Sequence, residues 1–406
     1  ETAHRYGLLV AAMDGNPKAK GLPFADEAFH VDINDLDAVF EVTDRLQPCA
    51  VVPAPIGHCL TTIGAVNDRY HLIGVSEEAA KKCTDKYRFH QEMAKAGLRK
   101  AEMLLLRKGT IVRGEELSAI TRFPVVVKPR LGSGSRGVEI CGNEQELRCL
   151  FQYEICGTNT KEGAGLLEDY IVETCIAGPE YGVDGAYVDG EFRMVLLRRK
   201  KNTPPPYRQC VGYYSVLREE EPVFYEKCCA LMQKMGEVLG FENCVVHADL
   251  IRMRNEAGEL TQEPFVIETS ARPSGHNLSN LFTPLATGVT LVEDFLKLAV
   301  PEPAENRARL FRPERTRKLL IRYFDLKPGR VTAVPDPEAL KRHFPLLDYV
   351  CSIRPGDELS EVTDGASVMG RGYYILEGES NAQLDEADER LRQEFSVETN
   401  AKGRTE

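Results

Sequence analysis

A glycine-rich loop directly follows an apolar run that ends in a lysine. The run 125–127 leads into Lys128, and the loop after it contains Gly132, Ser133, Gly134, Ser135 and Gly137. Its glycines and hydroxyls can present backbone N–H groups to phosphate oxygens, and the lysine adds a positive charge. The loop lacks the GxxxxGK[ST] phosphate motif and does not open a helix, so an ordinary glycine-rich hairpin is the alternative interpretation.

Two acidic residues fall on a pair of strands expected further along the chain. Asp249 lies in the run 245–253 and Glu268 in the run 264–269, and the polar turn 255–258 joins the two runs. This pattern predicts an antiparallel hairpin. Two facing carboxylates repel each other unless a cation lies between them, and Mg²⁺ prefers carboxylate oxygens together with substrate phosphates. A salt bridge to a neighbouring arginine is the alternative.

The order of these features resembles the ATP-grasp superfamily. There a helix lysine, a lysine before a glycine-rich loop, a glutamate at the adenine hinge and an acidic strand pair ending in E-x-N-x-R follow one another. The matching stretch runs from Lys86 to Val300, with Glu268-Thr269-Ser270-Ala271-Arg272 at the last motif. The fold class implied is α/β and α+β: an ATP-grasp fold, preceded by a Rossmann-like α/β domain and followed by a β-rich C-terminal module.

The resemblance implies an ATP site. Its residues would be Lys86, Lys128, Gly132, Ser133, Gly134, Ser135, Gly137, Glu168, Tyr170, Ile171 and Glu180. The two lysines would contact the phosphates and offset their charge. Glu168 would accept a hydrogen bond from the adenine amino group. Backbone groups of Tyr170 and Ile171 would continue that contact, and Glu180 would hold the ribose. A solvated helix lysine, for Lys86, and exposed strand carboxylates are the alternatives.

The resemblance also implies a metal site and a catalytic arginine. Asp249 and Glu268 would bind one or two Mg²⁺ ions, with Mn²⁺ as a substitute. Ser270 would be a third ligand, but it stands where the family usually has Asn and is a weaker ligand, which leaves the second ion open. Arg272 would hold the substrate carboxylate and the developing oxyanion.

Three further stretches resemble the branch of L-amino acid ligases and related carboxylate-amine ligases. They are the basic run 198–201 ahead of three prolines, His247-Ala248-Asp249, and the C-terminal Arg371-Gly372-Tyr373-Tyr374. Lys200 or Lys201 would reach the γ-phosphate, and a solvated basic face is the alternative. The substrate pocket would be lined by His247, Ser274, Gly275 and His276. A structural role is the alternative for each histidine.

The elements that must position these residues divide the chain into three parts. They are a pre-ATP-grasp α/β domain at 1–83, a catalytic region at 84–300 with a lid at about 120–200, and a β-rich module at 301–406. Strand-like runs at Leu8–Ala12, Ala50–Pro53 and Leu72–Gly74 alternate with helical stretches in the first part, which is the cadence of a parallel α/β unit. Because Glu1–Tyr6 reads as the end of a helix, we expect the opening β-α unit to be missing.

Helices are expected beside the lysines. Asp85 follows Thr84 at the start of a helix over 86–96, which Gly97 closes, and Ser76 caps the helix before it. Further helices are expected over 225–239 and 381–394, and a strand is expected over 166–171.

Composition limits the classes of function. The formal net charge of −11 at pH 7 argues against a general binder of nucleic acid or anionic membranes, so an anionic ligand must find local positive charge. No apolar stretch approaches the roughly 18 residues of a membrane span, and the N-terminus lacks a signal-peptide pattern, so we expect a cytoplasmic protein. The 12 cysteines show no CxxC and no zinc-finger spacing, so reduced thiols are expected.

The sequence thus predicts an ATP-dependent ligase. It would phosphorylate a carboxylate with ATP and let an amine displace phosphate, joining amino acids, or a small carboxylic acid and an amino acid, through an amide or peptide bond. Its partners would be small-molecule carboxylates and amines, and a homodimer is the base-rate expectation. The alternatives are a bicarbonate-using carboxylase or carbamoyl-type enzyme, and a non-catalytic ATP-binding accessory protein, which Ser270 motivates.

Overall fold

The computed structural model describes most of the chain. The described residues are 1–53, 57, 59–112, 115–132, 134, 136–155, 165–204, 208–300, 304–363 and 365–398. Ser133 and Ser135, two of the predicted phosphate-binding residues, lie outside them.

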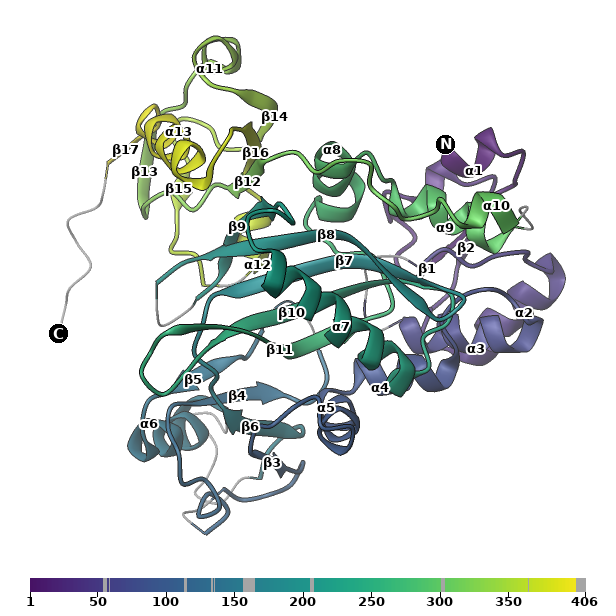
Figure 1. Cartoon of the computed structure of the whole chain (residues 1–406), viewed down its shortest axis with the longest axis horizontal. Helices are drawn as coiled ribbons and strands as arrows, with labels where there is room; N and C mark the ends of the chain where they lie inside the picture. The colour runs from purple at the N-terminus through teal and green to yellow at the C-terminus, as the bar shows by residue number, and fades with distance from the viewer. Residues whose placement is uncertain are drawn as a thin grey trace.

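A large antiparallel sheet forms the centre of the molecule (Figure 1). Its strands in spatial order are β11 (Leu260–Ser270), β10 (Cys244–Arg254), β7 (Glu180–Val188), β8 (Glu191–Asn202), β9 (Cys210–Val216), β12 (Leu319–Tyr323), β16 (Gly372–Glu377) and β14 (Leu346–Cys351). The predicted hairpin is confirmed, because Asp249 on β10 pairs directly with Glu268 on β11.

A smaller sheet lies below the large one in Figure 1. Its order is β3 (Met103–Leu106), β6 (Tyr170–Thr174), β4 (Val125–Pro129) and β5 (Glu139–Cys141), and α6 (Glu144–Cys149) with a π-helical turn (Leu150–Ile155) covers it. The expected strand over 166–171 begins only at Tyr170. The small sheet therefore spans 103–174, whereas β7 and most of β8, which the expected lid at 120–200 included, belong to the large sheet.

Helix α7 (Pro222–Leu239) covers one face of the large sheet. Proline at its first turn and Gly240 in the left-handed conformation after it fix its ends. On β10, Ala248 and Leu250 pack in the core with α7. Side chains alternate along a strand, so Asp249 points to the opposite face, away from α7.

The N-terminal block is only partly the predicted α/β unit. It contains α1 (Thr2–Arg5), β1 (Ala11–Asp14), a 3₁₀ turn (Leu22–Phe24), β2 (Glu27–His30), α2 (Leu36–Leu46) and α3 (Leu60–Tyr70). β1 and β2 pair in parallel. The predicted strands at 50–53 and 72–74 do not form. Pro53 has no N–H to donate to a ladder, and Gly74 packs against Asn67 in the turn after α3.

The helices beside the predicted phosphate lysine form as expected. Helix α4 (Glu77–Thr84) is capped by Ser76, and α5 (Lys86–Lys95) is capped by Asp85, whose carboxylate accepts from the backbone N–H groups of Tyr87 and Arg88. Gly97 has φ +73° and follows the helix end. Lys86 is therefore the first residue of a well-capped helix.

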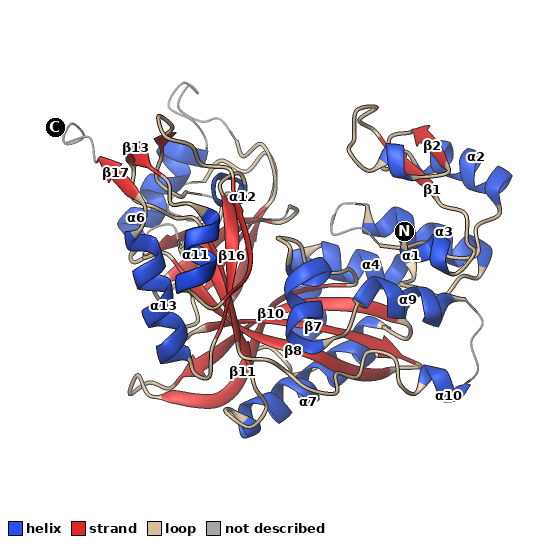
Figure 2. Ribbon diagram, turned by 90° about the horizontal axis from the view of Figure 1, so that it is seen from above, coloured by secondary structure: helices blue, strands red, loops and turns tan. Residues whose placement is uncertain are grey.

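The C-terminal part continues the large sheet through β12, β16 and β14. Around these strands lie the π-helical turn at Leu278–Phe282, α8 (Thr283–Thr287), α11 (Pro337–His343), α12 (Gly365–Met369) and α13 (Asn381–Gln393). Helix α9 (Leu291–Ala299) packs instead against β7, β8 and β10, and the carbonyl of Arg307 at the end of α10 (Ala304–Arg307) accepts from Arg193 on β8. A three-stranded sheet of β15 (Glu358–Leu359), β13 (Gly329–Ala333) and β17 (Ser396–Glu398) completes the module, and Figure 2 shows α13 beside β13 and β17. The expected boundary at residue 300 is thus not a boundary of the sheet.

Two expectations from composition can be checked against the described residues. None of the 11 cysteines among them forms a disulfide. None of the helices described is long and apolar enough to cross a membrane.

Candidate active site

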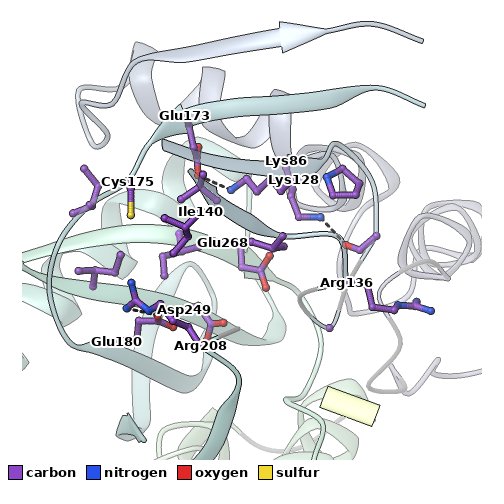
Figure 3. A pocket seen from close by; sticks show the side chains of 18 of the residues that line it. Lys86, Lys128, Arg136, Ile140, Glu173, Cys175, Glu180, Arg208, Asp249 and Glu268 are labelled. Atoms are coloured by element: carbon purple, nitrogen blue, oxygen red, sulfur yellow. Dashed lines mark hydrogen bonds and ion pairs between the residues drawn. The ribbon is translucent and has the colours of Figure 1, made fainter. Parts of the chain in front are cut away.

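A cleft lies between the small sheet and the face of the large sheet that does not carry α7 (Figure 3). The cations on its walls are Lys86, Lys128, Arg136, Lys200 and Arg208, and the carboxylates are Glu173, Glu180, Asp249 and Glu268. In a chain of net charge −11, this is a place where cations gather around a cavity. An anionic ligand that needs local positive charge can find it here.

The large-sheet wall carries the acidic pair. A β-bulge lies at this point, because Asp249 pairs with Glu268 whereas the next residue of β10, Leu250, pairs with Val266. The bulge leaves Ile267 as an extra residue, so Ile267 and Glu268 both line the cleft. The two predicted carboxylates therefore lie side by side on this wall, and the bulge turns the side chain of Glu268 toward the cleft.

Lys200 reaches into the cleft from β8. Its Nζ lies 2.7 Å from Oδ2 of Asp249 and 3.6 Å from Oε2 of Glu180. Burial lowers the pKa of this amine, but the two carboxylates outweigh burial and raise it, so the ammonium keeps its charge. Burial likewise raises the pKa of Asp249, and Lys200 outweighs it, so the carboxylate is ionised.

Lys201 does not reach the cleft, which corrects the prediction that either lysine could bind the γ-phosphate. Its Nζ lies 2.7 Å from Oδ1 of Asp385 and 2.9 Å from Oδ2 of Asp388, both on α13. Neighbouring side chains of a strand point to opposite faces, so one of the two lysines had to turn away. The basic run is therefore divided between the cleft and the C-terminal module.

The small-sheet wall holds Lys128 against a buried carboxylate. Lys128 Nζ lies 2.7 Å from Oε1 of Glu173 on β6, and Arg99 Nη2 lies 2.7 Å from Oε2. His90 Nδ1 is 3.0 Å from that second oxygen. Burial would raise the pKa of Glu173, but Lys128 and His90 outweigh it and hold the pKa far below the usual range. Glu173 therefore fixes the ammonium of Lys128 with a permanent negative charge.

Lys86 meets the glycine-rich loop. Its Nζ donates to the carbonyl oxygen of Gly132 over 2.7 Å. The helix start is tied to the strand before the loop, because Arg130 lies 2.6 Å from the capping carboxylate of Asp85 and 2.9 Å from Asp169. Lys86, Lys128, Gly132 and Gly134 all line the cleft, whereas Gly137 packs near Pro129 at the end of the loop.

The residues predicted for the adenine hinge do not line the cleft. Glu168 is exposed and outside the cleft, and Tyr170 packs edge-on against Phe151 in the core of the small sheet. Ile171 is fully buried and does not line the cleft either. The residues of this segment that do line it are 173–176, at the carboxyl end of β6, followed by Glu180. The predicted strand ended at Ile171, two residues before Glu173, the acidic residue of β6 that lines the cleft.

The predicted catalytic arginine and substrate residues lie beyond the acidic pair. Arg272 is near Asp249 and Glu268, and its buried Nε has no partner among the described residues. His247, across from Ser270, has a buried Nδ1 without a described partner, and burial lowers its pKa to about 3. Its imidazole is therefore neutral at pH 7.

Ser274 and His276 are held by structural contacts. The Arg198 guanidinium donates to Oγ of Ser274 over 3.4 Å, and Tyr323 donates its hydroxyl to the carbonyl of His276. Burial lowers the pKa of His276. Nothing lies within 4 Å of a Cβ built on Gly275, which leaves open space at that position. These residues lie outside the lining of the cleft, so their role in binding substrate stays a prediction.

The acidic pair fits a hard cation that is completed by phosphate oxygens. Asp249 and Glu268 face each other across a strand pair, and both line the cleft that the lysines enter. Ser270 follows on the same strand but is 8% exposed and pairs with His247. Among the described residues, no three His, Cys, Asp or Glu side chains gather as a metal cage. Two carboxylates plus substrate phosphates is the ligand set that Mg²⁺ uses at nucleotide sites.

The cleft residues that sequence reasoning missed include four with charged or amide side chains: Arg136, Glu173, Arg208 and Gln209. Glu173 had a usable signal, because an acidic residue at the end of an apolar run marks where a strand leaves a core. Arg208 and Gln209 had none, since they follow a proline-rich connector and only the pairing of β8 with β9 returns them to the cleft.

The cleft thus combines three lysines, glycines of the glycine-rich loop and a facing acidic pair between two antiparallel sheets. Residues 121–277 match the family model of the ATP-grasp domain. The L-arginine-specific L-amino acid ligase of Bacillus subtilis is 23% identical over 381 residues, which is 89% of this chain and 84% of that protein.

Solved structures share the whole architecture. The L-amino acid ligase from Bacillus licheniformis superposes with a TM-score of 0.73 at 17% identity, covering 98% of this chain and 94% of that one. N5-carboxyaminoimidazole ribonucleotide synthetase from Thermotoga maritima gives 0.66 at 17% identity, covering 98% and 95%. Residues 121–277 therefore match an ATP-grasp domain, and the chain as a whole is similar to ATP-grasp carboxylate-amine ligases. The predicted fold class is confirmed.

Proposed function

We propose that this protein is an ATP-dependent ligase that joins a carboxylate, such as that of an amino acid, to the amine of an amino acid. The observation that carries the proposal is the convergence of Lys86, Lys128 and Lys200 on one cleft with the facing pair Asp249 and Glu268. Three ammonium groups match a triphosphate, and the pair matches a divalent cation bound with it. ATP-grasp enzymes generally use ATP and Mg²⁺.

The first step would transfer the γ-phosphoryl group. A carboxylate oxygen of the substrate attacks the γ-phosphorus, the bond to the β-γ bridging oxygen breaks, and an acyl phosphate and ADP form. Phosphoryl transfer depends mainly on in-line positioning and on cations beside the phosphate oxygens. Lys200 would supply one such charge, and Lys128, fixed by Glu173, another. A metal ion held by Asp249 and Glu268 would neutralise further phosphate charge.

The second step would form the amide. The neutral amine attacks the acyl carbon, loses a proton, and phosphate leaves. Arg272 lies near the acidic pair and would donate to the oxyanion that develops on the acyl carbon. Because water would destroy the acyl phosphate, the cleft would have to exclude water while the amine attacks.

The proposal favours the amino-acid branch because the B. subtilis relative is matched over most of both chains. The carboxylase alternative has one specific observation in its favour, the shared fold of N5-carboxyaminoimidazole ribonucleotide synthetase. Ser270, the departure that motivated a non-catalytic accessory protein, is present beside the acidic pair. All three predict binding of ATP and differ in what triggers its hydrolysis.

The test is phosphate release from Mg-ATP over a matrix of paired L-amino acids, with single amino acids and bicarbonate in parallel. Asp249→Asn and Glu268→Gln remove the pair, and Glu263→Gln is the matched control, since Glu263 is exposed on β11 and pairs with Lys227 outside the cleft. Release that needs two amino acids, is lost in the first two variants and persists in the control supports the ligase. Phosphate release with bicarbonate alone would overturn the ligase proposal in favour of the carboxylase. Binding of ATP without turnover on any substrate would overturn it in favour of the accessory protein.

A further inference from the structure

Arg208 stands at the end of the β8–β9 hairpin in a strained backbone conformation. Its φ is +45°, in the left-handed region that non-glycine residues rarely adopt. The turn is held on both sides, because Thr203 N donates to the carbonyl of Gln209 and Gln209 N donates to Oγ1 of Thr203. A residue kept in such a conformation costs about 1 kcal/mol or more, and such residues cluster at functional sites.

The side chain of Arg208 enters the cleft and meets Glu180. Its Nη2 lies 3.2 Å from Oε1 of Glu180, while Lys200 lies 3.6 Å from the other oxygen (Figure 3). Lys200 in turn lies 2.7 Å from Asp249. The four groups thus form a row of alternating charge along the large-sheet wall.

Arg208 is the most accessible member of that row. Its side chain is 32% exposed, against 8% for Lys200, 20% for Glu180 and 25% for Asp249. A guanidinium has five N–H donors in a planar fork, and the contact with Glu180 uses one end of it. Arg208 can therefore turn to a new anion without being drawn out of a buried ion pair.

The ligand proposed for the cleft would offer that anion. If Glu180 holds ribose hydroxyls, those hydroxyls bring no charge, so they cannot replace the carboxylate as a partner for a cation. The phosphates are the new negative charge in the cleft, and guanidinium pairs with phosphate in a two-pronged geometry that a lysine cannot match.

We propose that Arg208 is a phosphate-binding residue of the nucleotide site, whose guanidinium turns from Glu180 to a phosphate of ATP when the nucleotide binds. This inference rests on the proposed function, because it takes the cleft to be an ATP site. It adds an arginine to the three lysines and assigns the strained backbone a role: holding the guanidinium at the mouth of the cleft. The competing role is purely structural, with Arg208 only orienting Glu180 for ribose.

The two roles separate in a series of nucleotides. Isothermal titration calorimetry of adenosine, AMP, ADP and ATP would be compared between the unmodified protein, Arg208→Ala and Arg208→Gly. Glycine adopts a positive φ without strain, so the glycine variant keeps the turn and its melting temperature while the guanidinium is lost. Arg199→Ala is the control for loss of a positive charge. Arg199 precedes Lys200 on β8 and lies over the ring of Tyr214, on the face of the sheet opposite the cleft.

Both Arg208 variants are expected to weaken ATP binding by about 10- to 100-fold, the range for losing a hydrogen bond to a charged group. Adenosine binding should change less than about twofold, and Arg199→Ala should match the unmodified protein for every ligand. The first nucleotide in the series adenosine, AMP, ADP and ATP whose affinity falls in the Arg208 variants identifies which phosphate Arg208 contacts. Equal weakening of adenosine and ATP would overturn the inference in favour of a structural role, and unchanged ATP binding would overturn it outright. If the unmodified protein bound none of the four ligands, the proposed function would fail with it.

Discussion

Replacing Glu173 by glutamine tests whether the buried carboxylate organises the small-sheet wall. Its side chain is 6% exposed, with Lys128 and Arg99 each at 2.7 Å. Glutamine keeps the shape and removes the charge, which leaves two buried cations without their anion. Removing one member of a buried ion pair costs about 3–5 kcal/mol, far more than the pair itself is worth against an apolar substitute. We expect a loss of that size in the free energy of unfolding.

The assay is urea unfolding followed by far-UV circular dichroism, since the chain has no tryptophan. Combining Glu173→Gln with Arg99→Met removes one of the two buried cations that Glu173→Gln leaves without an anionic partner. The double variant should therefore be more stable than the sum of the single losses predicts, by about 1 kcal/mol or more. Binding of ATP should weaken in Glu173→Gln, because nothing then fixes the ammonium of Lys128.

Glu92→Gln is the control for this experiment. Glu92 pairs with Lys95 over 2.9 Å at the exposed end of α5, and such a pair is worth less than about 1 kcal/mol. If Glu173→Gln destabilised the protein no more than this control, the buried network would not hold the wall together. Strict additivity in the double variant would refute the coupling between Arg99 and Glu173.

Three shorter predictions concern other parts of the chain. Lys200→Met should lower kcat by about 100-fold or more. Lys201→Met should leave ATP affinity unchanged and cost about 1–3 kcal/mol of stability, because buried Asp388 loses one of its cationic partners and keeps Arg322; equal kinetic effects of the two variants would contradict the division of the strand. Gly236→Ala should cost about 1–3 kcal/mol in chemical unfolding, because its Cβ would lie 2.1 Å from the Tyr187 ring, while Gly21→Ala, with open space, should be neutral. The low pKa of His247 means that the unfolded chain binds a proton the folded one excludes. Below about pH 6.5 the protein should lose about 1.4 kcal/mol per pH unit that His247→Gln does not lose, and parallel pH curves from pH 7 to pH 5 would disprove it.

Features that depend on one short segment could be predicted from the sequence. The cap at Asp85, the lysine at the end of 125–128 and the hairpin bearing Asp249 and Glu268 each depend on spacing within one or two adjacent elements. The structure places these features as the sequence predicted.

Features that depend on which strands pair, and in which register, could not be predicted from the sequence. The bulge at Ile267 arises from the register between β10 and β11, and the alternation along β8 could not say which lysine faced the cleft until the neighbouring strands were known. That Tyr170 and Ile171 do not line the cleft could not be predicted, because they look like any strand residues until Phe151 packs against Tyr170. In the N-terminal block, the apolar runs 50–53 and 72–74 predict strands, but Pro53 has no N–H to donate to a ladder and Gly74 packs against Asn67.

The continuity of the large sheet makes the C-terminal module indispensable. β12 pairs with β9 through Leu320, Ile321 and Arg322, and β9 is the direct neighbour of β8. A fragment that stopped at residue 300 would leave the backbone of β9 bare along one side, and such an edge invites intermolecular pairing and aggregation. Lys201 would also lose Asp385 and Asp388 in the same cut. Strand β8, which carries Lys200, would then be next to an exposed edge strand. We therefore expect that residues 1–300 cannot be expressed as a separate, stable enzyme.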